Sequence, residues 1–176
     1  GSLRLGQFVI REQDASCYWG IDVTDRFIAE GKALVGESLI ASKAPRFGLI
    51  DEKTVRAIAD WKPDFVFSNA VLQHVPPAEL STYFDRLATM MGDGCEAMII
   101  YIAAPALERI KAMSWAYPRV VLARAARAAD PDWQIDFSMV PMDADGGEHR
   151  ERNVMFLRRP VATAARIAVG DLVAAY

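Results

Sequence analysis

The stretch Asp64–Pro77, which reads DFVFSNAVLQHVPP, joins a short apolar run to a polar loop that carries Asn69 and His74. The apolar run Phe65–Phe67 favours β structure and is typical of a central parallel strand that is covered on both faces. A helix is predicted to begin at the proline pair, because proline lacks an N–H that the first helical turn would leave unpaired anyway. The loop therefore lies at the carboxyl end of a strand, where open α/β sheets bind ligands.

The residues that follow complete one βαβ unit. Apolar side chains recur at helical spacing from Leu80 to Met91, and Gly92 and Gly94 end this predicted helix. A second apolar run, Ala97–Ile102, is long enough for a strand. The order strand, polar loop, helix, strand predicts two neighbouring parallel strands.

This order of features resembles the second half of a class I S-adenosylmethionine-dependent methyltransferase. The resemblance rests on six features in this order: the apolar strand, Ser68-Asn69, the His-Val-Pro-Pro segment, the amphipathic helix, Gly-Asp-Gly and the second strand. The resemblance implies an α/β fold with a Rossmann-like, doubly wound and mostly parallel sheet that has an antiparallel edge hairpin. It also implies S-adenosyl-L-methionine as the cofactor.

The beginning of the chain extends the resemblance. Gly1–Gly6, GSLRLG, is similar to the last part of the glycine-rich loop of that family, although Gly1-Ser2 could equally be the remnant of a tag. An acidic residue is expected about 20 residues after such a loop, at the end of the second strand. Asp22 occupies that place, directly after the strand-like run Cys17–Ile21. On this interpretation, the first strand and the first two loop glycines lie upstream of residue 1.

The resemblance implies a role for several residues of the chain. Asp22 would accept hydrogen bonds from the ribose hydroxyls, and Gly1 would belong to the glycine-rich loop. Val23 would line the adenine. Asp51 could reach the adenine amino group, or it could simply start the next helix. Asn69 and Ala70 would face the methionine part of the cofactor, mainly through backbone groups.

His74 is the candidate catalytic base, because an imidazole titrates near neutral pH. The alternative is a structural histidine that bonds to the backbone and fixes the loop. The other histidine, His149, lies in a polar loop and is interpreted as a surface residue that could touch the substrate. No set of residues has the spacing of a metal site.

The remaining pattern predicts one methyltransferase domain over residues 1–160 and a helical tail over 161–176. The segment Ala103–Ala116 is either a substrate lid or a helix packed on the core. The other predicted helices and strands are Leu5–Arg11, Asp25–Leu34, Lys53–Trp61 and Pro118–Ala129 as helices, Arg46–Ile50 as a strand, and Trp133–Val140 with Asn153–Arg158 as an antiparallel hairpin.

The composition and charge of the chain argue against nucleic acid as its partner. The 176 residues are 52% hydrophobic, and the net charge of −3 leaves no basic stripe for nucleic acid. Arg119, Arg124 and Arg127 are predicted to form a solvated helix face, and Arg158-Arg159 a solvated strand end. Cys17 and Cys95 are interpreted as core thiols of a cytoplasmic protein without a membrane span.

The function that the resemblance implies is methyl transfer from S-adenosyl-L-methionine to a small molecule or a sugar, at oxygen. Two other classes stay open. A methyltransferase-like module could have lost cofactor binding and serve as an interaction domain. A doubly wound fold with a ribose-binding aspartate could also be an NAD-dependent oxidoreductase.

Overall fold

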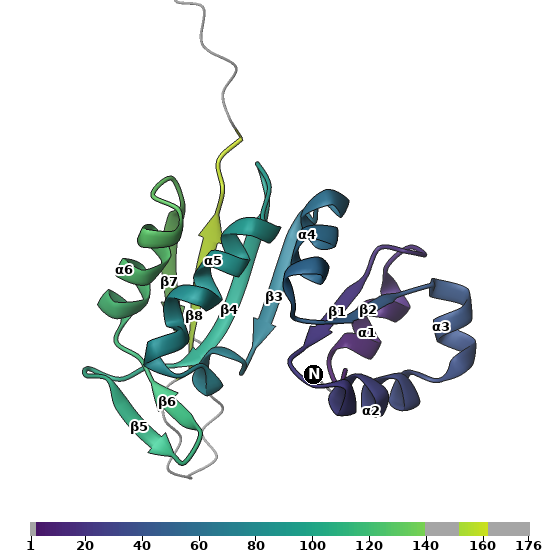
Figure 1. Cartoon of the computed structure of the whole chain (residues 1–176), viewed down its shortest axis with the longest axis horizontal. Coiled ribbons are helices and arrows are strands. Elements are labelled where there is room, and N and C mark those ends of the chain that lie inside the picture. The colour runs from purple at the N-terminus through teal and green to yellow at the C-terminus, as the bar shows by residue number, and fades with distance from the viewer. Residues whose placement is uncertain (1–2, 140–151, 162–176) are drawn as a thin grey trace, which may run out of the picture. The chain divides into compact units, whose positions relative to one another are not determined.

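The computed structural model of the chain describes residues 3–139 and 152–161. These residues form two compact units, residues 1–61 and 62–176, and each is described by itself (Figure 1). Three features predicted from the sequence lie outside the described residues: the loop glycine Gly1, the polar-loop residue His149 and the helical tail beyond residue 161.

The first unit contains a pair of parallel strands, β1 and β2. Trp19 lies opposite Arg46 and Asp22 lies opposite Leu49 in this pair. The elements of the unit are α1 (Gly6–Glu12), β1 (Trp19–Asp22), α2 (Asp25–Val35), α3 (Glu37–Lys43), β2 (Arg46–Leu49) and α4 (Glu52–Trp61). Its core is made by Leu3, Ile10 and Val35, with Tyr18, Leu39, Ile40 and Phe47 packed against them.

Local signals explain most of these boundaries. Helix α2 begins where predicted, because the Thr24 hydroxyl accepts a hydrogen bond from the Arg26 N–H at 3.2 Å. Helix α3 was not predicted. It follows Gly36, whose φ of 83° lies in a region that glycine adopts without steric cost, so the chain turns there and a second helix begins.

The second unit is built on a four-stranded sheet with the strand order β3-β4-β8-β7. Strand β3 runs parallel to β4, whereas β8 is antiparallel to both β4 and β7. Its elements are β3 (Phe65–Asn69), the 3-10 turns η1 (Leu72–His74) and η2 (Pro77–Glu79), α5 (Leu80–Met90), β4 (Glu96–Ile102), β5 (Glu108–Lys111), β6 (Ser114–Ala116), α6 (Arg119–Ala129), β7 (Gln134–Met139) and β8 (Arg152–Arg158). The predicted βαβ unit and the predicted antiparallel hairpin are confirmed.

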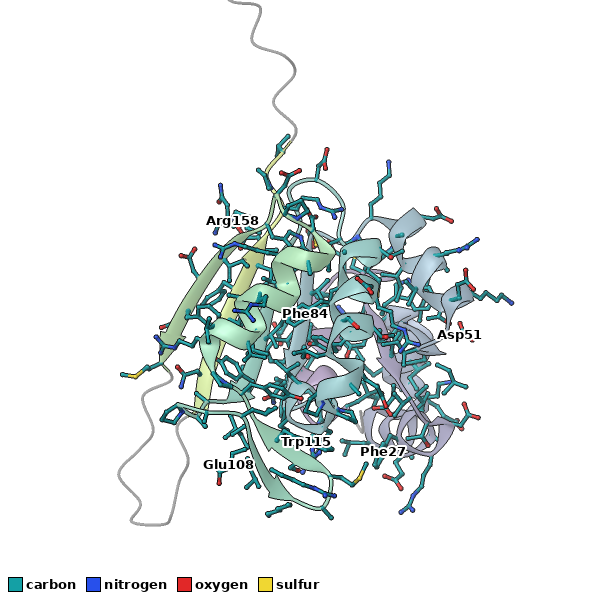
Figure 2. The ribbon with its side chains drawn as sticks, turned by 60° about the vertical axis from the view of Figure 1, so that its left-hand side comes forward. Phe27, Asp51, Phe84, Glu108, Trp115 and Arg158 are labelled. Carbon is teal, nitrogen blue, oxygen red and sulfur yellow. The ribbon has the colours of Figure 1, made fainter. Side chains whose placement is uncertain are left out.

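Helices α5 and α6 lie side by side over one face of this sheet (Figure 1). The strand β4 turns Ala97, Ile99 and Tyr101 into the core, and each of them is at most 1% exposed. Phe84 of α5 is fully buried in the interior, with its ring 6.5 Å from that of Trp133 (Figure 2). None of the helices in the described ranges is long and apolar enough to cross a membrane.

The predicted central position of Phe65–Phe67 is wrong for the described chain. Strand β3 is at the edge of its sheet, and within residues 3–139 and 152–161 no strand pairs with its outer edge. Phe65 is 52% exposed and Phe67 is 40% exposed. The apolar run correctly indicates a strand suited to burial. Burial itself depends on neighbours, which a local run cannot show.

The segment after β4 is a β-hairpin, so its interpretation as a helix packed on the core is wrong. Strands β5 and β6 pair antiparallel, and Trp115 and Glu108 lie on this hairpin beyond the carboxyl end of β4 (Figures 1 and 2). The interpretation of the segment as a substrate lid stays a prediction.

Of the two cysteines predicted to be core thiols, one is exposed and one is buried. Cys17 is exposed and precedes β1, so it is not a core thiol. Cys95 is buried as predicted, and burial raises the pKa of its thiol to about 11.

Arg159 is half-buried rather than solvated, and it closes the end of the second unit. Its Nε donates to Asp130 Oδ2 at 2.8 Å, and its other nitrogens donate to the same oxygen and to the carbonyl of Met91. The Asp130 side chain is only 10% exposed, and its second oxygen accepts from the Asp132 N–H. Arg159 therefore joins the ends of α5, α6 and β8 by charge-assisted hydrogen bonds.

Replacing Arg159 by Met should lower the free energy of unfolding by roughly 2–3 kcal/mol, because Asp130 would remain buried without its cation. Chemical denaturation measures this change. The matched control is Arg158→Met, since Arg158 pairs with Glu96 on the surface, where such a pair contributes about 0–1 kcal/mol. Equal losses in the two variants would contradict the assigned role of Arg159.

Candidate functional site

The loop at the carboxyl end of β3 begins with an unusual backbone conformation. Asn69 is the last residue of the strand and is exposed, and Ala70 follows with a φ of 57°. The Ala70 N–H donates to the carbonyl of Ile100 on β4 at 3.2 Å, which holds the turn against the sheet. A left-handed conformation costs a residue with a Cβ roughly 1–2 kcal/mol, and such strain concentrates at functional sites.

His74 ends the turn η1 of the same loop, and its ring is tied to the β5–β6 hairpin. Its Nδ1 lies 2.7 Å from the carbonyl oxygen of Met113 and 3.3 Å from the Ser114 hydroxyl. A carbonyl only accepts, so Nδ1 carries the proton in the neutral ring. The Nε2 atom is then an acceptor, and the amide nitrogen of Gln73 lies 3.1 Å from it.

This geometry fits both interpretations of His74. The bond from Nδ1 to a backbone carbonyl is what a structural histidine would make. The same bond also fixes the tautomer that leaves Nε2 able to take a proton, as a general base requires. His74 is exposed, so Nε2 is not shut away in the core.

Two tyrosines hold the loop and the end of the strand before it. Tyr117, which is fully buried, donates its hydroxyl to the carbonyl of Val75 at 2.6 Å. Tyr83 donates to the Ser68 hydroxyl at 2.8 Å. Burial raises the pKa of each tyrosine to about 12, so both hydroxyls stay protonated and act as donors near neutral pH.

In the first unit, Asp22 ends β1 and Val23 follows it. Asp22 is half-buried, and its Oδ1 accepts a hydrogen bond from the Thr24 N–H at 3.1 Å. Val23 is 78% exposed. The pair thus places a carboxylate and an exposed apolar surface side by side.

Asp51 follows β2 in the same unit and caps helix α4. Its Oδ1 accepts from the Thr54 N–H at 2.7 Å, and this hydrogen bond lowers the pKa of the carboxyl group. The interpretation of Asp51 as the start of the next helix is therefore confirmed, and its contact with adenine stays a prediction.

The structure brings the predicted site residues into two groups. Asp22, Val23 and Asp51 belong to the first unit. Asn69, Ala70 and His74 lie at the end of β3 and in the loop that follows it, in the second unit. In the described part of the chain, no three His, Cys, Asp or Glu side chains lie close enough to hold a metal ion.

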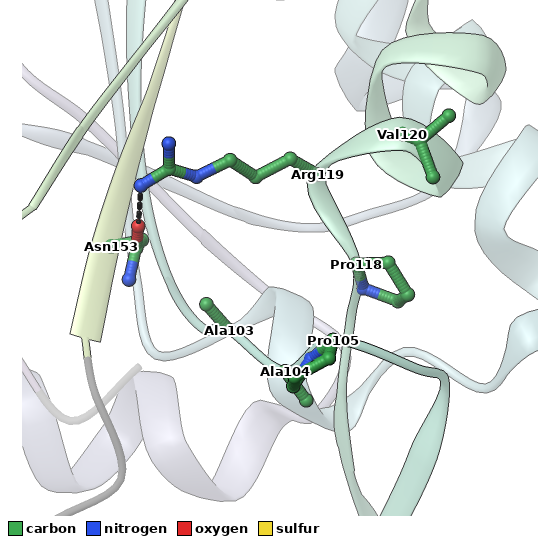
Figure 3. A pocket seen from close by; sticks show the side chains of 7 residues that line it. All are labelled: Ala103, Ala104, Pro105, Pro118, Arg119, Val120 and Asn153. Carbon is green, nitrogen blue, oxygen red and sulfur yellow. Dashed lines mark hydrogen bonds between the residues drawn. The ribbon is translucent and has the colours of Figure 1, made fainter.

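A hollow with a volume of about 620 Å³ lies at the carboxyl end of β4 and the start of α6 (Figure 3). Its lining residues are Ala103, Ala104, Pro105, Pro118, Arg119, Val120 and Asn153. Arg119 reaches across to β8 and donates to Asn153 Oδ1 at 2.5 Å. Sequence reasoning missed this pair, because it assigned Arg119 to a solvated face. One feature of the sequence could have indicated the pair: a polar asparagine begins the otherwise apolar run Asn153–Leu157.

Comparisons with known proteins give a match to the fold and none to a sequence family. Neither a protein-family model nor a curated protein matches the chain. An S-adenosylmethionine-dependent methyltransferase from Methanosarcina mazei matches the structure with a TM-score of 0.67 and 14% identity, over 92% of this chain and 89% of that chain.

Two further solved structures with this fold have different names and reactions. Magnesium protoporphyrin IX methyltransferase from Synechocystis, with bound S-adenosylmethionine, matches with a TM-score of 0.62 and 16% identity, over 90% of this chain and 66% of that one. The (4+2)-cyclase SpnF matches with a TM-score of 0.67 and 13% identity, over 92% of this chain and 73% of its own. The chain has the fold of S-adenosylmethionine-dependent methyltransferases.

Replacing Ala70 by Val should lower the free energy of unfolding by about 1–2 kcal/mol, because a β-branched side chain is poorly accommodated at positive φ. Thermal and chemical denaturation measure this change. Ala70→Gly is the matched control and should be neutral or slightly stabilising, since glycine has no Cβ to clash. A valine variant as stable as the glycine variant would show that the conformation of Ala70 is not strained.

Proposed function

We propose that the chain binds S-adenosyl-L-methionine and transfers its methyl group to the oxygen of a small molecule or sugar. One observation carries the proposal: the fold matches S-adenosylmethionine-dependent methyltransferases over about nine tenths of the chain, including one with the cofactor bound. The experiment that tests it is a cofactor-binding measurement on the 176-residue chain, followed by a screen for methylated products.

The residues after β1 and β2 fit the nucleoside part of this cofactor. The Asp22 carboxylate has the acceptor chemistry that two ribose hydroxyls need. The exposed side chain of Val23 offers an apolar surface to the adenine ring. Asp51 would accept from the adenine amino group, and Gly1 would belong to the loop that precedes α1.

The loop after β3 would serve the methionine part. Ala70 turns the chain sharply at the strand end, and the bond from its N–H to Ile100 holds the backbone of Asn69 and Ala70 against the sheet. This anchoring matters for this reaction because alignment of the reacting atoms can supply much of the acceleration.

When bound, S-adenosyl-L-methionine supplies a sulfonium-bound methyl group that a nucleophile can attack in line. The chain's own task is to hold the acceptor and remove its proton. His74 Nε2 takes the proton from the acceptor hydroxyl as the new bond to carbon forms, and later releases it to water. The hydrogen bond from Nδ1 to Met113 keeps the ring in the tautomer that this step requires.

The proposal also places the expected first strand beside β3. Support comes from the unpaired outer edge of β3 in the described chain and from the exposure of Phe65 and Phe67. An apolar edge strand with open hydrogen-bonding groups is a template for another strand. In a longer chain that includes upstream residues, the amides of β3 should exchange with solvent more slowly.

A second candidate is a cofactor-binding domain whose reaction is not methyl transfer. The match to a cyclase favours keeping it, since that protein shares the fold. Product analysis separates the two functions, because methyl transfer adds the mass of a methylene group to the acceptor and yields S-adenosylhomocysteine. A rearranged product of unchanged mass would favour the second candidate.

Replacing Asp22 by Ala should weaken the binding of S-adenosyl-L-methionine by about 1.5–3 kcal/mol, the range for hydrogen bonds to charged groups. Isothermal titration calorimetry measures this loss. Asp25→Ala is the matched control, because Asp25 is an exposed carboxylate in the first turn of α2. Unchanged affinity in a folded Asp22→Ala variant would remove Asp22 from the proposed site.

Replacing His74 by Gln should lower turnover by roughly 10²–10⁴-fold at saturating substrates and leave cofactor affinity intact. Glutamine keeps polarity but cannot act as a base near neutral pH. A purely structural His74 predicts a different pattern, in which thermal stability and cofactor affinity fall together while turnover changes little. Steady-state kinetics combined with calorimetry distinguishes the two, and near-normal turnover would rule out the base.

A further inference from the structure

The polar side-chain groups that line the hollow at the start of α6 are hydrogen-bond donors. Arg119 contributes a guanidinium, which has no acceptor atom. Asn153 is 1% exposed, and its Nδ2 has no hydrogen-bond partner in the described part of the chain. A buried donor without a partner has lost its hydration without a replacement, so this amide group marks a place where an acceptor is missing.

The orientation of the Asn153 amide follows from its neighbour. Because Arg119 can only donate, the atom that faces it must be the amide oxygen. The amide nitrogen is therefore directed away from Arg119. Flipping the amide would set two donors against each other, so the unpartnered donor cannot be removed by exchanging oxygen and nitrogen.

The N-terminal end of helix α6, which carries a partial positive charge, also lies at the hollow. Arg119 is the first residue of α6, an eleven-residue helix whose N-cap Pro118 makes no side-chain cap and whose first turn contains no acidic residue. In the first turn, the N–H groups of Arg119 and Val120 have no intrahelical partner, whereas that of Val121 donates to the Pro118 carbonyl at 3.0 Å. The helix dipole favours negative charge at this end. Pro118, Arg119 and Val120 all line the hollow.

Arg119 is held in place without a counter-ion. Its guanidinium lies 5.8 Å from the centre of the Phe137 ring in addition to its bond with Asn153. Within residues 3–139 and 152–161, no carboxylate pairs with it. A guanidinium fixed by a ring and an amide is preorganised for a carboxylate, which matches its planar fork.

A second buried polar group lies beside this pair. Tyr101 is opposite Asn153 in the β4–β8 register, and its buried hydroxyl lies beside the Arg119 guanidinium. Burial raises the pKa of Tyr101, and the nearby Arg119 opposes part of that rise. The hydroxyl therefore remains a protonated donor close to Arg119.

The rest of the lining is apolar. Ala103, Pro105 and Val120 contribute only hydrocarbon side chains, and Val120, the second residue of α6, is 64% exposed. A ligand that fits such a surface combines one acceptor-rich anionic group with an apolar body. Inorganic phosphate lacks the apolar body, and a neutral ring lacks the charge.

We infer that this hollow binds the carboxylate of a small, apolar-bodied acid, held by Arg119, the Asn153 amide and the N-terminal end of α6. The inference rests on the proposed function, in which this acid is the methyl acceptor. It names the substrate class: a carboxylic acid whose flat or aliphatic body carries the hydroxyl to be methylated.

Benzoate is the probe, added to the isotopically labelled 176-residue chain without S-adenosyl-L-methionine. Chemical shifts of the Asn153 side-chain amide and the Arg119 Nε–H are followed by NMR. Benzoate should move both signals with a dissociation constant on the order of 1 mM, as expected for a ligand of this size. Arg119→Gln should raise that constant at least about tenfold, and Arg119→Lys, which keeps the charge, by less.

Arg124→Gln is the matched control, since Arg124 is exposed on the same helix but does not line the hollow. It should leave benzoate binding unchanged. Benzamide, the neutral analogue, should bind far more weakly than benzoate. Benzoate that binds as well to the folded Arg119→Gln variant, benzamide that binds equally, or phosphate that binds more tightly would each overturn the inference.

The two proposals can fail separately. If benzoate binds as expected while the chain shows no affinity for S-adenosyl-L-methionine, the proposed carboxylate site is supported and the proposed methyl transfer is refuted. If the cofactor binds and benzoate does not, the proposed function stands and this substrate class is wrong.

Discussion

The second unit depends on the register of strand β4, which is hydrogen-bonded on both edges. Ile100 holds the turn at Ala70, Tyr101 lies opposite Asn153, and the chain enters the hollow two residues later at Ala103. Side chains alternate along a strand, so a slip of one residue would turn Ala97, Ile99 and Tyr101 away from the helices. The loop after β3 and the hollow are therefore positioned by one constraint, the pairing of β4 with β3 and β8.

Features that depend on neighbouring residues in the sequence were predictable, and features that depend on distant ones were not. Helix spacing, the cap at Thr24 and the strand ends at Asp22 and Asn69 are local, and the predicted elements agree with the structure within a few residues. The hydrogen bonds of Arg119 and Arg159 could not be read from the sequence, because their partners, Asn153 and Asp130, are 34 and 29 positions away. The prediction that β3 is buried fails for the same reason. An apolar run indicates that a strand is suited to burial, but it does not show which other elements cover the strand.

His74 shows why the structural and the catalytic interpretations need not exclude each other. A base must be held in one tautomer with its free nitrogen accessible, and the bond from Nδ1 to Met113 provides the first condition. Exposure of the residue serves the second condition, and the Gln73 amide, 3.1 Å from Nε2, has to move aside before an acceptor hydroxyl can bond to that atom. The contact that would make His74 a scaffold residue is thus also the contact that a base would require. Only kinetics and stability measured together can assign its role.

Tyr117 connects the loop of His74 to the hollow. Its hydroxyl holds Val75, its backbone N–H donates to Ile102 at the end of β4, and the next two residues, Pro118 and Arg119, line the hollow. Met113 and Ser114, which contact His74, lie only a few residues before it. This short segment therefore fixes both the candidate base and the candidate carboxylate site. Because Tyr117 is fully buried and bonded at both ends, a displacement of one site would be resisted by the packing of the other.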